Sequence, residues 1–165
     1  MVTWIGSART GTALSELSYE SAVRALEVQE RAVDQVRSRT GTLLAVSSLS
    51  ASFFGAETIQ RSGGLGTLGA LALISLVASI LLCIYVLLPK TGFVFSVSGP
   101  AVYERLFAHA ADNEEVRRRL TYWLEEYWQA NEAKLEDLGR FYFAAAVALV
   151  AQLTFWSWAL AATIS

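Results

Sequence analysis

The stretch GTLLAVSSLSASFFGAETIQ, residues 41–60, decides how this chain must fold. It carries no charge before Glu57, and about 20 residues at 1.5 Å each cross roughly 30 Å of hydrocarbon. Four serines and two threonines interrupt its apolar residues. We therefore predict a transmembrane helix over 41–60, with its serines buried between helices instead of facing water.

A helical wheel at 100° per residue separates the small residues of this stretch from the bulky ones. Small residues allow close approach of a neighbouring helix, and serine hydroxyls can bond across the contact. We predict a helix-contact face containing Ser48, Ser52 and Gly55, with a pore-lining face as the alternative. The small face comprises Gly41, Ala45, Ser48, Ser52, Gly55 and Ala56, and the opposite face comprises Leu43, Val46, Leu49 and Phe53.

Two further segments are long and apolar enough to span a membrane. Residues 67–88 contain no charge, and Pro89 and Lys90 end the segment. Residues 141–164 begin at a Tyr/Phe cluster and carry two tryptophans near their far end, as membrane interfaces favour. Gln152 lies about twelve residues into this last span. An amide at that depth is disfavoured unless paired, so we expect it to bond another helix.

The charges gather between the spans. Hydrophobic residues make up 54% of the 165 residues and charged residues 17%, and the charges crowd into 16–39 and 104–140. Residues 14–38 and 112–138 read as amphipathic helices with an apolar stripe each. No proline separates either helix from its span, and Asp112 with Glu115 resembles a capping box. Residues 91–100 alternate like a strand, but one strand forms no sheet, so we expect a strand-like loop.

These elements predict an all-α integral membrane protein, a single membrane domain over 1–165. Three transmembrane helices are joined to two amphipathic cytosolic helices, whose stripes pack together as a stalk. Lysine and arginine in the flanks set the orientation. They place the N-terminus in the cytoplasm and the C-terminus outside the cell membrane: Arg31, Arg37 and Arg39 precede the first span, Lys90, Lys134 and Arg140 lie between the second and third, and Arg61 stands alone in the outer loop.

Little in the chain points to catalysis. The net charge of −2 gives no indication of nucleic-acid binding. His109 is the sole histidine and Cys83 the sole cysteine, so one chain cannot build a histidine-pair or thiolate metal site. No phosphate-binding loop or nucleophile–base pair is present in the pattern. We expect no enzyme activity, metal or cofactor.

Two charged groups are candidate contacts. Glu57 and Arg61 read as a helix-end ion pair, and a ring of Glu57 in an oligomer, attracting cations at a pore mouth, is the alternative. Arg117, Arg118 and Arg119 read as a solvated helix turn offset by Glu114 and Glu115. Contact of these arginines with an anion or a cytosolic partner is the alternative.

The order of these elements resembles small bacterial membrane proteins, the SLATT-type and Pycsar-type transmembrane effectors. The resemblance lies in a charged helix that runs through VRSRTGTLLAVSSLSASFFG into a serine-rich span, a second span, and a long polar helix before the last span. It implies assembly in the inner membrane and impairment of that membrane when a partner signals. We therefore expect a homo-oligomeric pore or membrane-perturbing effector in the lipid bilayer. The alternative is a membrane-anchored helical module that binds a cytosolic protein.

Overall fold

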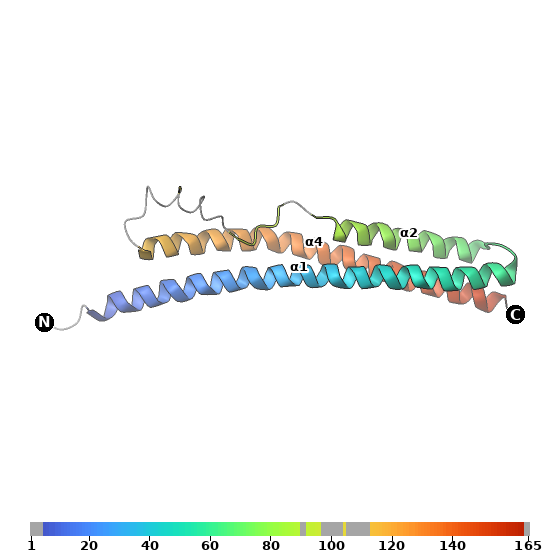
Figure 1. Cartoon of the computed structure of the whole chain (residues 1–165), viewed down its shortest axis with the longest axis horizontal. Coiled ribbons are helices and arrows are strands. Elements are labelled where there is room, and N and C mark those ends of the chain that lie inside the picture. Colours follow the sequence, from blue (N-terminus) through green and yellow to red (C-terminus); the bar gives the residue numbers. More distant parts are fainter. Residues whose placement is uncertain (1–4, 90–91, 97–103, 105–112, 164–165) are drawn as a thin grey trace. The chain divides into compact units, whose positions relative to one another are not determined.

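The described residues form three helices (Figure 1). The computed structural model describes residues 5–89, 92–96, 104 and 113–163. The helices are α1 (Ile5–Ser62), α2 (Thr67–Leu87) and α4 (Asn113–Ala162). All three are long and apolar enough to cross a membrane by length and composition. The prediction of an all-helical chain with three membrane-spanning segments is confirmed at this level.

The two long helices absorb elements that the sequence suggested as separate. Residues 14–38 and 41–60 both lie in α1, and residues 113–138 and 141–162 both lie in α4. One glycine in a helix interior costs about 1 kcal/mol, too little to end α1 at Gly41. At the same join, the Thr40 hydroxyl donates to the Val36 carbonyl at 2.7 Å. Asp112, its suggested cap and His109 lie outside the described residues.

The turn after α1 follows from its glycines. Gly63 has a positive φ of 72°, a conformation that favours glycine, and its N–H donates to the Ile59 carbonyl at 3.0 Å. After α2, the Leu88 N–H donates to the Ile84 carbonyl at 2.8 Å, and Pro89 prevents the helix from continuing. The observed second span thus ends within one residue of the predicted one.

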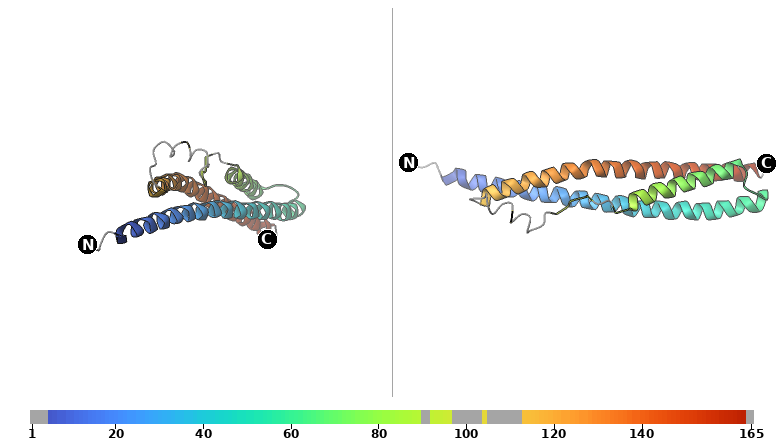
Figure 2. Two further views of the ribbon diagram at one scale, coloured as in Figure 1. Left: turned by 60° about the vertical axis from the view of Figure 1, so that its left-hand side comes forward. Right: turned by 90° about the horizontal axis from the view of Figure 1, so that it is seen from above.

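The chain divides into two compact units, which we call the polar unit and the apolar unit. The polar unit comprises residues 1–32 and 91–135, and the apolar unit comprises residues 33–90 and 136–165. Both α1 and α4 contribute to each unit, and they run in the same direction within it, whereas α2 runs the opposite way in the apolar unit (Figures 1 and 2).

In the apolar unit the three helices surround a core of small and medium side chains. Leu43, Cys83 and Ala145, one from each helix, form a buried cluster. Large apolar side chains on all three helices point outward, as Leu49, Ile74 and Phe143 show, each more than 60% exposed. Such a surface suits hydrocarbon and would be unfavourable in water.

In the polar unit α1 and α4 pack along one seam. Leu26 and Leu124, from the two predicted apolar stripes, are buried, and so is Gln29. The Gln29 amide donates to the Trp128 carbonyl at 3.0 Å, which ties the two helices together.

The buried positions of α4 recur every seven residues. This spacing is the heptad of parallel coiled coils, in which one face of a helix stays against its neighbour. Six residues of α4 follow it: Leu124, Asn131, Leu138, Ala145, Gln152 and Ala159, all below 9% exposed.

The described part of the strand-like segment, residues 92–96, is a loop held on α4 by one asparagine. The Val94 N–H donates to Asn131 Oδ1 at 3.2 Å, and Asn131 Nδ2 donates to the Val94 carbonyl at 2.9 Å. Lys134 donates to the Gly92 carbonyl and lies 5.6 Å from the centre of the Phe93 ring. A side-chain amide thus takes the place of a neighbouring strand. Residues 97–100 lie outside the described part.

We predict that Asn131→Leu releases this loop. The substitution leaves both polar groups of Val94 without partners, so amide exchange over residues 92–96 should speed up about tenfold or more. Hydrogen-exchange mass spectrometry in detergent measures it. Gln129→Leu is the control, because Gln129 is exposed and bonds Glu125 within its own helix at 3.2 Å. Unchanged protection of the loop in Asn131→Leu would contradict the assignment.

Candidate functional site

The predicted contact face of the first span divides between the interior and the surface. Gly55 is buried, and a Cβ placed there would lie 3.5 Å from the Trp156 ring of the same chain. Ser48 and Ser52 are exposed. Leu43, assigned to the opposite face, is buried in the core, so the predicted division of this helix into two faces is wrong. Gly55 serves packing within the chain, and the two serines remain available to a neighbour.

The exposed serines have satisfied hydroxyls. Ser48 donates to the Leu44 carbonyl and Ser52 donates to the Ser48 carbonyl, each at 3.0 Å. A hydroxyl bonded to its own helix is tolerated in hydrocarbon because no polar atom is left without a partner. These serines were predicted to lie buried between helices. In one chain they do not, and their own backbone removes the need for water.

A polar seam that the sequence reading missed lies inside the apolar unit. Ser47 and Ser79 are fully buried with their hydroxyl oxygens 3.3 Å apart, and Ser79 donates to the Ala145 carbonyl at 3.3 Å. Gln152 Nε2 donates to the Ser47 carbonyl at 2.9 Å. The expectation that Gln152 bonds another helix is confirmed. The heptad of α4 could have pointed to this seam, because Gln152 lies seven residues from Ala145.

Two buried polar atoms in this region have no hydrogen-bond partner among the described residues, Gln152 Oε1 and Trp156 Nε1. The Trp156 ring fills the space that two glycines leave. Gly55 of α1 lies on one side, and a Cβ at Gly69 of α2 would come within 3.7 Å of the ring. Only 1% of the Trp156 surface is exposed. Glycines therefore admit a large aromatic side chain at the centre of three packed helices.

The ion pair predicted at the end of the first span is present. Arg61 Nε and a second guanidinium nitrogen both lie 2.6 Å from Glu57 Oε1. Both side chains are partly exposed, so solvent screens the pair and its contribution to stability is small. In one chain the Glu57 charge is therefore offset by its neighbour one turn later.

Each of the three clustered arginines of α4 also has a carboxylate within 4 Å. Arg117 pairs with Glu16 of α1 at 3.7 Å, while Arg118 and Arg119 both pair with Glu115, at 2.6 and 2.7 Å. The pKa of Glu115 lies below its ordinary value, first because Arg119 donates a hydrogen bond to the carboxylate and then because of the two nearby positive charges. Arg118 uses Glu115 where the sequence had suggested Glu114.

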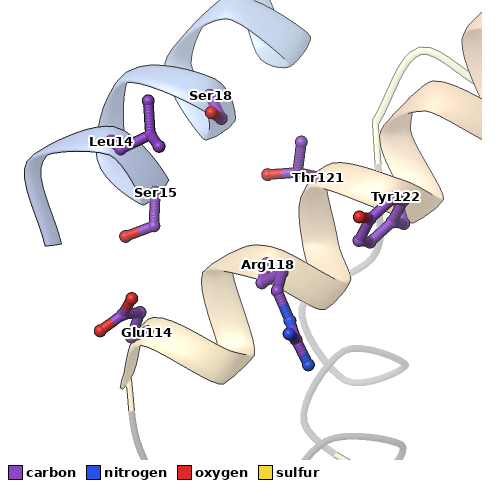
Figure 3. Close-up of a pocket in the computed structure, with 7 residues that line it drawn as sticks. All are labelled: Leu14, Ser15, Ser18, Glu114, Arg118, Thr121 and Tyr122. Carbon is purple, nitrogen blue, oxygen red and sulfur yellow. The ribbon is translucent and has the colours of Figure 1, made fainter. Parts of the chain in front are cut away.

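An open groove runs between α1 and α4 in the polar unit. One cavity of about 330 Å³ is lined by three residues of α1 and four of α4 (Figure 3). Leu14 and Tyr122 are its large side chains, 66% and 70% exposed. A second cavity of about 430 Å³ lies further along the same two helices, lined by Val28, Gln29, Trp128 and others. Both cavities are open to the surface.

No protein-family model, curated protein or solved structure matches this chain. Among the described residues no group of three His, Cys, Asp or Glu side chains is placed to hold a metal ion. The candidate sites are therefore argued from geometry alone: the exposed small face of α1, its terminal ion pair, and the groove of the polar unit.

We predict that Trp156→Ala destabilises the apolar unit by about 3–5 kcal/mol, because it leaves a cavity between three helices. Trp156→Phe should cost less, since it keeps most of the ring and removes the buried N–H that lacks a partner. Thermal unfolding in detergent measures both. Trp158→Ala is the matched control, because Trp158 is 63% exposed on the same helix. Equal losses at positions 156 and 158 would refute the packing role.

Proposed function

We propose that this protein is a homo-oligomeric membrane protein that acts as an ion-conducting pore or membrane-perturbing effector. The observation that carries the proposal is the surface of α1 that stays uncovered after its own helices have packed. Ala45, Ser48, Ser52 and Ala56 recur there at spacings of three and four, and all are exposed. A stripe of small residues on a spanning helix is a common contact between helices in membranes.

Conduction in this proposal requires more than one copy. Within one chain the helices of the apolar unit are packed around Leu43, Cys83 and Ala145. The polar seam beside them is closed by hydrogen bonds from Ser79 and Gln152. A water-filled path would therefore lie between copies, where Ser48, Ser52 and Glu57 can line it.

The proposed location is the cell membrane, with the N-terminus in the cytoplasm and the C-terminus outside. The exposed apolar side chains of the apolar unit support membrane insertion, and the lysines and arginines at its flanks support this orientation. The polar unit then forms the cytosolic stalk. The resemblance to SLATT-type and Pycsar-type effectors agrees with an oligomer that impairs the membrane.

A membrane-anchored module that binds a cytosolic protein is the second candidate. The exposed Leu14, Leu17 and Tyr122 of the polar unit favour it, since apolar surface in water marks an interaction site. Its predicted anchors Trp123, Tyr127 and Trp128 are half-buried, which leaves them less available to a partner. In this reading the spans hold the polar unit at the membrane and conduct nothing.

Substitution of the small stripe tests assembly. Ser52→Leu places bulk in the proposed contact, so we expect the oligomer fraction in native mass spectrometry to fall about tenfold. Thr154→Leu is the matched control, since Thr154 is exposed on α4 and its hydroxyl bonds the Val150 carbonyl at 2.8 Å, as the Ser52 hydroxyl bonds Ser48. Leu49→Ala, beside the stripe, should have little effect. Equal losses in all three variants would reject this stripe as the contact.

The terminal ion pair makes opposite predictions for its two members. If Glu57 lies at a pore mouth, Glu57→Gln should lower the preference for cations over anions, and Arg61→Gln should raise it by freeing the carboxylate. Reversal potentials in planar bilayers under a salt gradient measure both. Selectivity that is unchanged in both variants would leave the pair as a helix end, and the absence of any conductance would favour the anchored module.

A further inference from the structure

The groove of the polar unit has the pattern of a second helix contact. On α1 its lining residues recur at spacings of three and four, and on α4 the same holds for its central part. This face lies beside the seam that already joins α1 and α4, so it is left over once that seam has formed. The α1 residues are Leu14, Ser18, Ser21, Ala25, Val28 and Ala32. The α4 residues include Thr121, Trp128, Glu132 and Leu135.

The groove is apolar and uncovered. Leu14, Val28 and Tyr122 are 66%, 62% and 70% exposed. Large apolar side chains gathered along one groove of a unit that stands in water indicate an interaction surface. The small residues between them on α1 would let another helix approach closely.

Opposite charges stand on the two walls of the groove at the same level. Arg24 of α1 and Glu132 of α4 line the same cavity. In the described part of the chain Arg24 forms no ion pair, although Glu20 precedes it by four residues. Glu132 accepts one long bond of 3.4 Å from Gln29. Beside them Gln29, 5% exposed, has a buried Oε1 without a partner in the described residues.

Membrane orientation restricts how a second copy can meet this groove. Copies that span one bilayer in the same direction are related by an axis along the membrane normal. A two-fold rotation about that axis sets the α1 wall of one copy against the α4 wall of the other at the same height. Arg24 of each copy then faces Glu132 of the other, and Leu14 of each faces Tyr122. The groove is therefore complementary to itself in both charge and apolar contact.

We propose that this groove binds a second copy of the chain, face to face. The contact joins two pairs of helices into a parallel four-helix bundle, with apolar residues at its centre and two Arg24–Glu132 ion pairs between the copies. The inference rests on the proposed function in that it takes the chain to span the membrane with the polar unit in water. It adds a water-side contact to the membrane-side contact through Ser52.

Two charge reversals, tested apart and mixed, examine this proposal. Arg24→Glu sets carboxylates of two copies against each other, and Glu132→Arg does the same with guanidinium groups, so each alone should lower the dimer fraction about tenfold. Chains of the two variants complement each other when mixed. With different mass tags, native mass spectrometry should find mixed dimers well above the about half that random pairing gives.

The outcomes separate a second copy from other occupants. Both residues are exposed, so circular dichroism should show unchanged helix content in each variant. Arg24 and Glu132 that pair within one chain would weaken each variant without favouring mixed dimers, which would overturn the proposal. A cytosolic protein or a lipid in the groove would leave self-association unchanged in every variant, with the same consequence. If mixing fails while Ser52→Leu still splits the oligomer, the proposed function survives and this inference does not.

Discussion

The seam between α1 and α4 is the contact on which the rest of the structure depends. It supplies every seventh residue of α4 with a place out of solvent, in the polar unit and in the apolar unit alike. The residues that occupy it change along the chain. Leu124 and Leu138 on α4 give way to Ala145, Gln152 and Ala159, and on α1 Leu26 and Val33 give way to Thr40 and Ser47.

This change has a physical cause. In water, large apolar residues hold two helices together because burial removes their surface from solvent. In hydrocarbon that driving force is absent, and helices associate through close packing of small residues and through hydrogen bonds. The transition from leucine and valine to alanine, serine and glutamine within one seam is therefore what a helix pair needs if it passes from water into a bilayer. The third helix, α2, joins where the small residues begin, and its Ser79 and Cys83 belong to the same class.

The sequence predicted the spans well because length, hydropathy and charge act over many residues at once. The uncharged second span was located to within one residue, and the amide of Gln152 identified itself as a group that must bond another helix. The faces of the first span were harder to predict. Small residues occur around more than half of that helix, so a wheel shows where a neighbour can approach but not which neighbour arrives. Gly55 meets Trp156 of its own chain, while Ser48 on the same predicted face meets nothing within it.

The loop at 92–96 illustrates a different limit. Alternation of Phe93 and Phe95 with Val94 is a sound signal for extended backbone, but extended backbone needs a partner for its N–H and C=O groups. That partner is the side chain of Asn131, nearly forty residues away, and no local pattern announces it. A polar residue in the heptad of α4 was the available signal. Asn131 stands midway between Leu124 and Leu138, where an apolar residue would be expected.

The same exposure has opposite meanings in the two units. Leu49 and Phe53 are as exposed as Leu14 and Tyr122, all between 66% and 71%. In a bilayer the first pair rests in lipid and needs no partner, so its exposure carries no information about assembly. With the polar unit in water, the second pair leaves apolar surface uncovered and makes association favourable. The two proposed contacts would then respond to different conditions. Contact through Ser52 depends on the lipid or detergent that competes for the helix surface, whereas contact through the groove strengthens with apolar burial and weakens in salt as its ion pairs are screened. Dependence of the oligomer on ionic strength would thus arise in the polar unit, because the small stripe of α1 bears no charge.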